Sequence, residues 1–173
     1  MIDLLLQVIW FMLPAYVANL LPPLFSHVKM GRVLDGPVDL GHKAFGKRIF
    51  GDHKTVKGFM VGTTGGILTA IVQHSLIGDY SFYFSFTLGF LLGFGALFGD
   101  SIESFLKRQL GVRSGGALPV FDQIDFPVGA LLLSSIVVDL DLGFMAVIVV
   151  VSGLLSTLAN LIAYALKIKK VWW

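Results

Sequence analysis

The chain has 173 residues, of which 55% are hydrophobic and only 14% charged, and its formal net charge is +2. A soluble domain usually carries about 25% charged residues. This composition, with a mean hydropathy of +0.83, predicts a polytopic membrane protein whose length is spent on membrane spans and short loops. The sequence contains no cysteine, which excludes disulfides, thiol catalysis and cysteine-ligated zinc.

Taken in chain order, five segments are long and apolar enough for membrane helices, each of which needs about 20 residues. They are residues 2–25, 58–77, 82–99, 120–138 and 143–166. We therefore expect an all-α fold in which residues 1–173 form a single transmembrane catalytic domain.

Two of these segments have unusual features. The first contains Pro14 and ends at Pro22-Pro23, which predicts a kink and then a stop. The fourth is cleanly apolar only from Phe126 onward, which is too short to cross alone. A start near Val120 completes it and places two aspartates inside the helix.

The basic residues predict the orientation. All 13 lysines and arginines lie in the first loop, the third loop or the C-terminal segment, and the two other turns contain none. The positive-inside rule then places the N-terminus outside and the C-terminus in the cytoplasm of a cell-membrane protein. The first loop, residues 27–57, is long, and loops of this length in compact proteins are often functional. We therefore expect two long cytoplasmic loops and a working surface that faces the cytoplasm.

The third loop carries a dense group of ionisable residues next to apolar runs. Ionisable groups at bilayer depth are costly and mark functional sites. If the third span continues as a helix, Asp100, Ser104, Lys107 and Arg108 lie at i, i+4, i+7 and i+8, on one face, with Glu103 on its flank.

Asp122 and Asp125 lie at i and i+3 near the start of the fourth span. Facing Asp100, they complete three carboxylates around a cavity with a Lys/Arg pair nearby, a set that suits a divalent cation bridging carboxylates and phosphate. The intervening Gly115-Gly116 allows backbone N–H groups to cradle a phosphate, although a Gly-Gly pair taken alone more often marks an ordinary turn. Asp125 taken alone also suits a helix N-cap before Phe126-Pro127.

The spacing of these residues resembles the signature of the CTP-dependent phosphatidate cytidylyltransferases. That signature has Gly-Asp, Glu-Ser, Lys-Arg and a final Asp pair, which correspond here to Phe98-Gly99-Asp100, Glu103-Ser104, Lys107-Arg108 and Asp122-Gln123-Ile124-Asp125. Lys54-Thr55-Val56-Lys57-Gly58 is similar to the family's Lys-Thr-x-Glu-Gly segment before a span. The five-span layout is most similar to the archaeal branch, the CDP-archaeol synthases.

Three departures favour the archaeal branch over the bacterial one. Gln123 stands where arginine is usual, and Lys57 stands where glutamate is usual. The His-Gly-Gly element of the bacterial pattern is absent, because only Val120-Phe121 separates Pro119 from Asp122.

The resemblance implies a reaction that joins CTP to an unsaturated ether-lipid phosphate, 2,3-di-O-geranylgeranylglyceryl phosphate, and yields CDP-archaeol and pyrophosphate. It implies Mg²⁺ held by Asp100, Asp122 and Asp125. The expected partners are CTP, the lipid phosphate and the bilayer, without nucleic acid.

The same resemblance implies roles for individual residues. Lys107 and Arg108 belong with the metal carboxylates in the catalytic group, where they stabilise the triphosphate. The remaining residues expected to contact substrate or CTP are Lys54, Thr55, Lys57, Glu103, Ser104, Arg113, Gly115 and Gly116. Asn19 and Asn160, which lie in apolar spans, are expected to form interhelical hydrogen bonds.

Two other classes of membrane protein share part of this pattern. Charged residues within spans also mark ion pathways, so a small transporter or channel is the alternative, although the chain lacks the internal repeats common in transporters. A CDP-alcohol phosphotransferase needs Asp-Gly-x-x-Ala-Arg, and Asp35-Gly36 is followed by Pro37-Val38-Asp39-Leu40, so this match fails.

Overall fold

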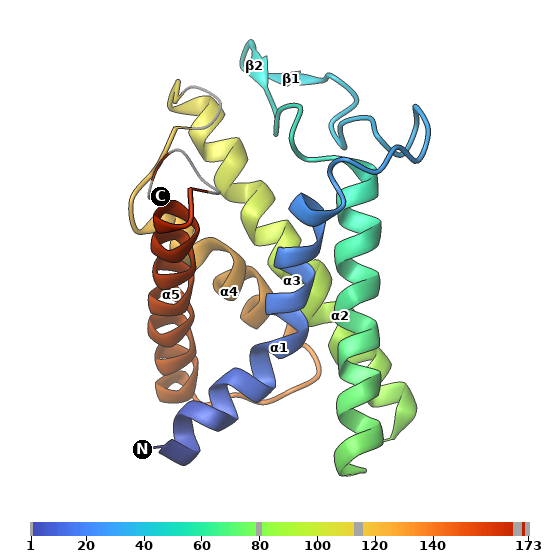
Figure 1. The fold of residues 1–173 in the computed structure, drawn as a ribbon, viewed down its shortest axis with the longest axis vertical. Coiled ribbons are helices and arrows are strands. Elements are labelled where there is room, and N and C mark those ends of the chain that lie inside the picture. Colours follow the sequence, from blue (N-terminus) through green and yellow to red (C-terminus); the bar gives the residue numbers. More distant parts are fainter. Residues whose placement is uncertain (1, 79–80, 113–115, 168–170, 172–173) are drawn as a thin grey trace.

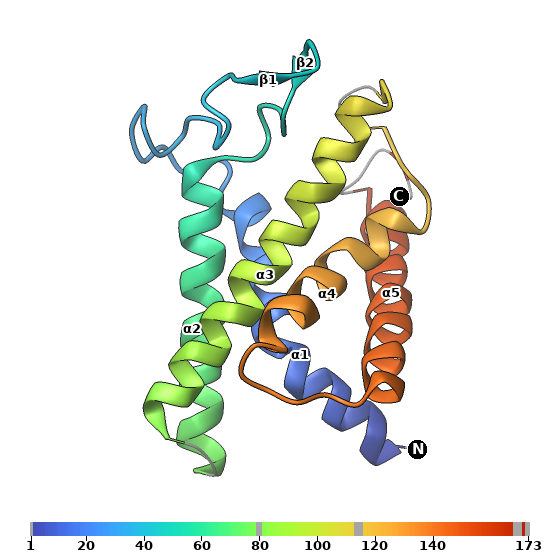
Figure 2. The same cartoon turned by 180° about the vertical axis from the view of Figure 1, so that it is seen from behind.

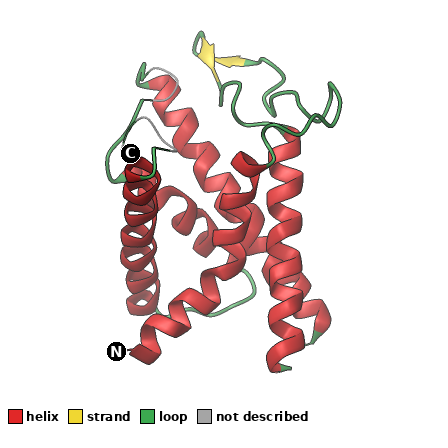
Figure 3. Cartoon of the chain, in the orientation of Figure 1, coloured by secondary structure: helices red, strands yellow, loops and turns green. Residues whose placement is uncertain are grey.

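Helices make up most of the described part of the chain, and a long irregular first loop covers one end of them (Figure 1). The computed structural model describes residues 2–78, 81–112, 116–167 and 171. The elements in chain order are α1 (Ile2–Leu24), β1 (Lys43–Ala44), β2 (Lys47–Arg48), α2 (Val56–Ile77), α3 (Phe82–Gln109), α4 (Phe121–Ser134) and α5 (Leu142–Ala165). The small antiparallel hairpin of β1 and β2 is an addition to the expected all-α fold (Figure 3). It lies at the same end of the bundle as the C-terminal end of α5, and the N-terminus lies at the opposite end.

Four of the helices, α1, α2, α3 and α5, are long and apolar enough to cross a membrane. The fourth predicted span behaves differently, because α4 has only 14 residues. At 1.5 Å per residue it is about 21 Å long, less than the roughly 30 Å of a bilayer core. Figure 2 shows that α4 ends part-way along the bundle and that a non-helical segment continues to the start of α5.

The prediction of a helix throughout residues 120–138 is therefore wrong after Ser134. The hydroxyl groups of Ser134 and Ser135 donate to the carbonyl oxygens of Leu131 (3.3 Å) and Leu132 (2.8 Å). Serine hydroxyls that bond to nearby backbone groups compete with regular helix. The chain leaves the helix here, and Val138 N–H still donates to Ser134 O at 3.0 Å in a turn.

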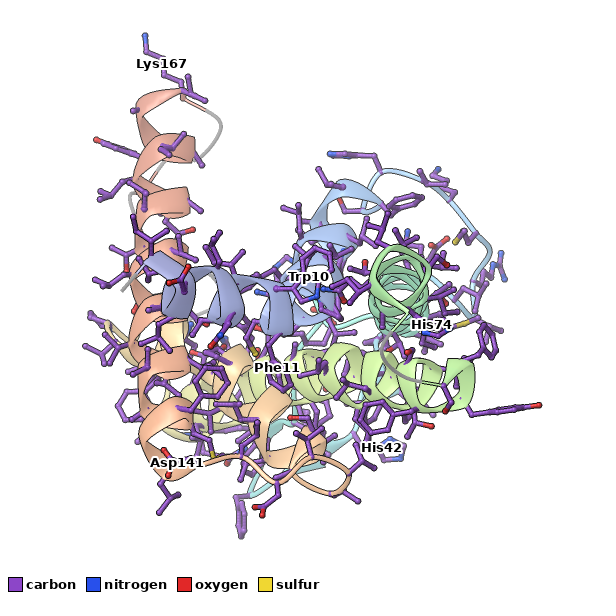
Figure 4. The ribbon with its side chains drawn as sticks, turned by 90° about the horizontal axis from the view of Figure 1, so that it is seen from below. Trp10, Phe11, His42, His74, Asp141 and Lys167 are labelled. Carbon is purple, nitrogen blue, oxygen red and sulfur yellow. The ribbon has the colours of Figure 1, made fainter. Side chains whose placement is uncertain are left out.

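The kink expected at Pro14 is visible as a bend midway along α1 (Figure 1). Proline has no N–H, so the carbonyl oxygen of Trp10, four residues earlier, loses its helical partner. The side-chain amide of Gln73 on α2 donates to this oxygen at 2.7 Å, and Figure 4 labels Trp10 on the part of α1 beside α2. An exposed carbonyl at bilayer depth is costly, so this hydrogen bond allows the kink to persist in the membrane.

Glycines allow α3 to approach two neighbours closely. Gly89 and Gly93 lie against Gly66 of α2, where a Cβ on Gly66 would come within 2.9 Å of the Gly93 Cα. Gly95 and Gly99 lie against Gly129 of α4, where a Cβ on Gly95 would come within 2.6 Å of the Gly129 carbonyl oxygen. The two small-residue pairs of α3 therefore face different helices, and backbone contact fixes the depth of α4.

We predict that Gly99→Ala destabilises the protein by about 1–3 kcal/mol, the usual cost of overpacking. The new Cβ would overlap the backbone carbonyl of Asp125, so α4 must move. The measurement is thermal unfolding of the detergent-purified protein, with a decrease in Tm of about 2–4 °C per kcal/mol. Gly153→Ala on α5 is the control, because its Cβ would meet Ile124 at an ordinary 3.5 Å. Equal decreases for both variants would contradict the proposed contact.

Candidate active site

A polar cavity of about 460 Å³ lies at the hairpin end of the bundle. Side chains from α1, the first loop, α3, α4 and α5 line it. The predicted site residues in its wall are Lys54, Asp100, Glu103, Ser104, Lys107, Arg108, Gly116, Asp122 and Asp125. The structure therefore brings together most of the residues that sequence spacing singled out.

Three carboxylates gather in this cavity. One oxygen each from Asp100, Glu103 and Asp125 lie within 4.8 Å of one another. Asp100 and Glu103 are one helical turn apart on α3, and the contact between Gly99 and the Asp125 backbone brings the third carboxylate from α4. Three hard oxygen donors at this spacing fit a divalent cation such as Mg²⁺.

Asp122 is placed differently from the other two aspartates. Its Oδ2 lies 3.0 Å from the Lys107 ammonium, and its Oδ1 accepts the Leu118 N–H at 2.9 Å. Lys107 also lies 2.6 Å from a Glu103 oxygen. Lys107 therefore bridges α3 and α4, and Asp122 lies next to this lysine and beside Glu103, at the edge of the three-carboxylate group.

The first loop contributes Lys54, whose ammonium forms an ion pair with Asp100. Thr55 accepts the Gly58 N–H at 3.1 Å and caps α2, which fixes where the loop ends. Lys57, in the first turn of α2, is buried against the loop: its ammonium lies 2.8 Å from Asp35 and donates to Val28 O at 2.6 Å. The hydrogen bond from Lys57 lowers the pKa of Asp35.

A second cavity of about 750 Å³ adjoins the first. It is lined by Lys29, Thr55 and Lys57 on its polar side, and by Pro22 and Leu97 among its apolar residues. The walls shared by the two cavities are formed by Asn19, Asp52, His53, Lys54 and Asp100. The Lys54–Asp100 ion pair thus lies on the boundary between two adjoining cavities.

Several lining residues were not identified from the sequence as parts of the site. They are Asn19, Arg48, Phe50, Gly51, Asp52, His53, Ser156 and Asn160. A signal was available for two of them, because Asn19 and Asn160 are the only asparagines in the chain and both lie in apolar segments. Among the predicted residues, Arg113 and Gly115 lie outside the described part of the chain.

Comparison with known proteins identifies the family. The family described as "CarS-like: CDP-archaeol synthase" matches residues 1–173. The chain belongs to the CDP-archaeol synthase family.

Individual relatives agree along nearly the whole chain. A CDP-archaeol synthase of Methanococcus maripaludis is 41% identical and covers 98% of this chain and 97% of the relative. Those of Methanopyrus kandleri and Archaeoglobus fulgidus are each 40% identical, with 95% and 100% of this chain covered and 91% and 100% of the relatives. A solved structure described as "Structural insight into an intramembrane enzyme for archaeal membrane lipids biosynthesis" is 32% identical, with a TM-score of 0.76, and covers 90% of this chain and 94% of that chain. The comparisons support an enzyme and do not favour the transporter reading.

We predict that Lys107→Met destabilises the protein by about 3 kcal/mol, because removing one partner leaves buried carboxylates unpaired. The side chains of Lys107, Glu103 and Asp122 are only 13%, 6% and 18% exposed. Thermal unfolding in detergent measures the loss, with Lys43→Met on the exposed hairpin strand as the control. Adding Glu103→Gln to Lys107→Met should recover part of the stability, and no recovery would argue against this ion pair.

Proposed function

We propose that the protein transfers the cytidylyl group of CTP to a lipid phosphate, 2,3-di-O-geranylgeranylglyceryl phosphate, and forms CDP-archaeol and pyrophosphate. The observation that carries the proposal is the three-carboxylate cluster of Asp100, Glu103 and Asp125, flanked by Lys54 and Lys107. This set suits two polyanionic substrates and a divalent cation, and the chain belongs to the CDP-archaeol synthase family.

The two adjoining cavities suggest one place for each substrate. The 460 Å³ cavity holds the carboxylates together with Lys107 and Arg108, so we assign it to CTP. The 750 Å³ cavity combines Lys29 and Lys57 with apolar residues of the helices, so we assign it to the lipid phosphate. Lys54 lies on the shared wall, where the two reacting phosphates must meet.

The donor set fits Mg²⁺, because Asp100, Glu103 and Asp125 offer three carboxylate oxygens within 4.8 Å and no softer ligand. When bound, Mg²⁺ would neutralise phosphate charge and polarise the α-phosphorus. The sequence predicts Asp122 in this set as well; its Oδ2 lies 3.0 Å from the Lys107 ammonium, and we propose that it orients this lysine.

The chemistry requires alignment and charge compensation more than proton transfer. A lipid phosphate oxygen attacks the α-phosphorus of CTP, the bond from that phosphorus to the bridging oxygen breaks, and pyrophosphate leaves with the electron pair. Lys107 and Arg108 compensate the charge of the triphosphate and the leaving pyrophosphate, and the Ser104 hydroxyl donates to a phosphate oxygen. A phosphate oxygen is already nucleophilic, so the site needs no general base.

We propose that residues 1–173 form one catalytic domain in the cell membrane, with the N-terminus outside and both cavities facing the cytoplasm, where CTP is present. The distribution of the 13 basic residues supports this orientation. Four long helices can cross the membrane, and the proposed orientation requires a fifth crossing, which we propose is made by α4 together with the turns after it.

An assay of the purified protein tests the proposed reaction. Incubation in detergent with labelled CTP, Mg²⁺ and either the ether-lipid phosphate or a diacyl lipid phosphate should give a CDP-lipid. Product with the ether lipid supports the full proposal, and product with only the diacyl lipid would correct the substrate. If no lipid phosphate gives product, while the protein in liposomes conducts ions without added metal, the enzyme reading is wrong.

We predict that Asp125→Asn raises the Mg²⁺ concentration for half-maximal rate by at least about 10-fold, since loss of groups at a metal site typically costs that much affinity. Asp122→Asn should lower turnover by misplacing Lys107 while leaving the Mg²⁺ requirement unchanged. Mg²⁺ titrations of both variants at saturating CTP make the comparison. An equal increase in the Mg²⁺ concentration for half-maximal rate in both variants would indicate that Asp122 also binds the metal.

Labelling of single introduced cysteines tests the proposed orientation, because the sequence contains no cysteine of its own. A Cys at Lys43 should react with a membrane-impermeant maleimide only after cells are permeabilised. A Cys at Asp139, in the turn before α5, should react in intact cells. The reverse pattern would invert the proposed topology.

A further inference from the structure

Arg48 lines the 460 Å³ cavity but has no assigned role. It is the last residue of β2, and its register partner across the hairpin is Lys43. The hairpin is tied to the cytoplasmic half of α3, because the Lys47 ammonium donates to the carbonyl oxygen of Gln109 at 2.6 Å. Figures 1 and 2 both show the hairpin close to this end of α3. Arg48 therefore occupies a fixed position beside the cavity.

One edge of the Arg48 guanidinium is held by a shielded carboxylate. Arg48 Nη2 donates to Asp39 Oδ1 at 2.8 Å and Nε donates to Oδ2 at 3.4 Å, and the Asp39 side chain is completely buried. Three backbone N–H groups, of Gly41, Phe50 and Gly51, also donate to this carboxylate at 3.0–3.1 Å. Two side-on contacts to one carboxylate fix the plane of the guanidinium.

The Asp39 carboxylate and the Arg48 guanidinium hold each other in their charged forms. Burial alone would raise the pKa of Asp39, but the hydrogen bonds from Arg48 and from the backbone outweigh it and hold the pKa well below its usual range. Asp39 in turn raises the pKa of Arg48. The pair therefore stays ionised throughout the physiological pH range.

The other edge of the guanidinium has a weaker partner. Arg48 Nη1 lies 2.9 Å from Asp52 Oδ1, and the Asp52 side chain is 81% exposed. In contrast, Asp100, the partner of Lys54, is 28% exposed, and the carboxylates beside Lys107 are 6% and 18% exposed. An exposed ion pair contributes little stability, so Nη1 exchanges its partner at low cost.

We infer that Arg48 is a further CTP-binding residue, whose Nη1 edge leaves Asp52 and donates to a phosphate of the nucleotide while Asp39 holds the opposite edge. Asp39 is then a positioning residue, and Asp52 competes with the nucleotide for Arg48. This inference rests on the proposed CTP-dependent reaction and adds a binding group from the first loop.

Steady-state kinetics with CTP and the lipid phosphate varied separately test the inference. Arg48→Ala should raise the KM for CTP by about 10-fold or more, as expected for the loss of a charge-assisted hydrogen bond, and should leave the KM for the lipid phosphate within about 2-fold. Lys43→Ala removes the same charge from the adjacent strand and is the matched control, with an unchanged KM for CTP.

Three variants separate binding from a purely structural role. Arg48→Lys keeps the charge but cannot contact Asp39 side-on and reach a phosphate together, so its KM for CTP should stay raised several-fold. Asp39→Asn should raise the same KM in the folded protein and should also lower its Tm, because the amide N–H₂ would face N–H donors that the carboxylate accepts. Asp52→Asn removes the competitor and should lower the KM for CTP by about 2–5-fold, the effect of a surface ion pair.

The outcomes are distinguishable. A KM for CTP that is unchanged or higher in Asp52→Asn overturns the inference, even if Arg48→Ala does not fold. The inference is also overturned if Arg48→Ala and Arg48→Lys lose kcat or folded yield without a change in the KM for CTP. Arg48 would then have only a structural role. If the wild-type protein forms CDP-lipid while these results occur, only the role of Arg48 fails. If the wild-type protein forms no CDP-lipid, the proposed function itself fails.

Discussion

The backbone contact between α3 and α4 is the constraint on which the site depends. Gly99 has no side chain, so the carbonyl of Asp125 can approach it, and Gly129 takes part in the same contact. Asp100 follows Gly99 directly, so one close approach places carboxylates of two helices within reach of one ion. Neither helix could shift along or rotate about its axis by a residue without separating Asp100 from Asp125.

The carboxylates gathered at this contact repel one another, and lysines from α3 and from the first loop compensate their charge. Lys107 arises from the same helix as Glu103 and also reaches Asp122 on α4, while Lys54 comes from the first loop to Asp100. Each lysine therefore joins two elements as well as neutralising charge. These ion pairs hold the side chains in place before substrate enters, which lowers the entropic cost of ordering them on binding. A bound cation and the substrate phosphates would then replace the lysines and carboxylates as each other's partners.

Much of this arrangement was accessible from the sequence, because helical spacing places Asp100, Ser104 and Lys107 on one face regardless of tertiary packing. The sequence could not reveal which carboxylates meet, since that depends on the rotation of α4 about its axis and on the glycine contact. The end of α4 was also missed, because the serine hydroxyls end the helix in a segment whose hydropathy remains high. The ion pair between Arg48 and Asp39 could not be predicted, because it joins distant parts of an irregular loop that has no periodic sequence pattern.

The shortness of α4 separates the geometry of the active site from the thickness of the membrane. Helices that cross the whole hydrocarbon layer respond to a thicker or thinner bilayer by tilting, and this applies to the four long helices. A helix of 14 residues is not stretched between two interfaces, so its depth follows α3, to which its glycine is fitted. We therefore expect the distance between Asp100 and Asp125 to depend on the contact between α3 and α4 and not on bilayer thickness, so that the site would tolerate changes in the lipids that the enzyme's own products form.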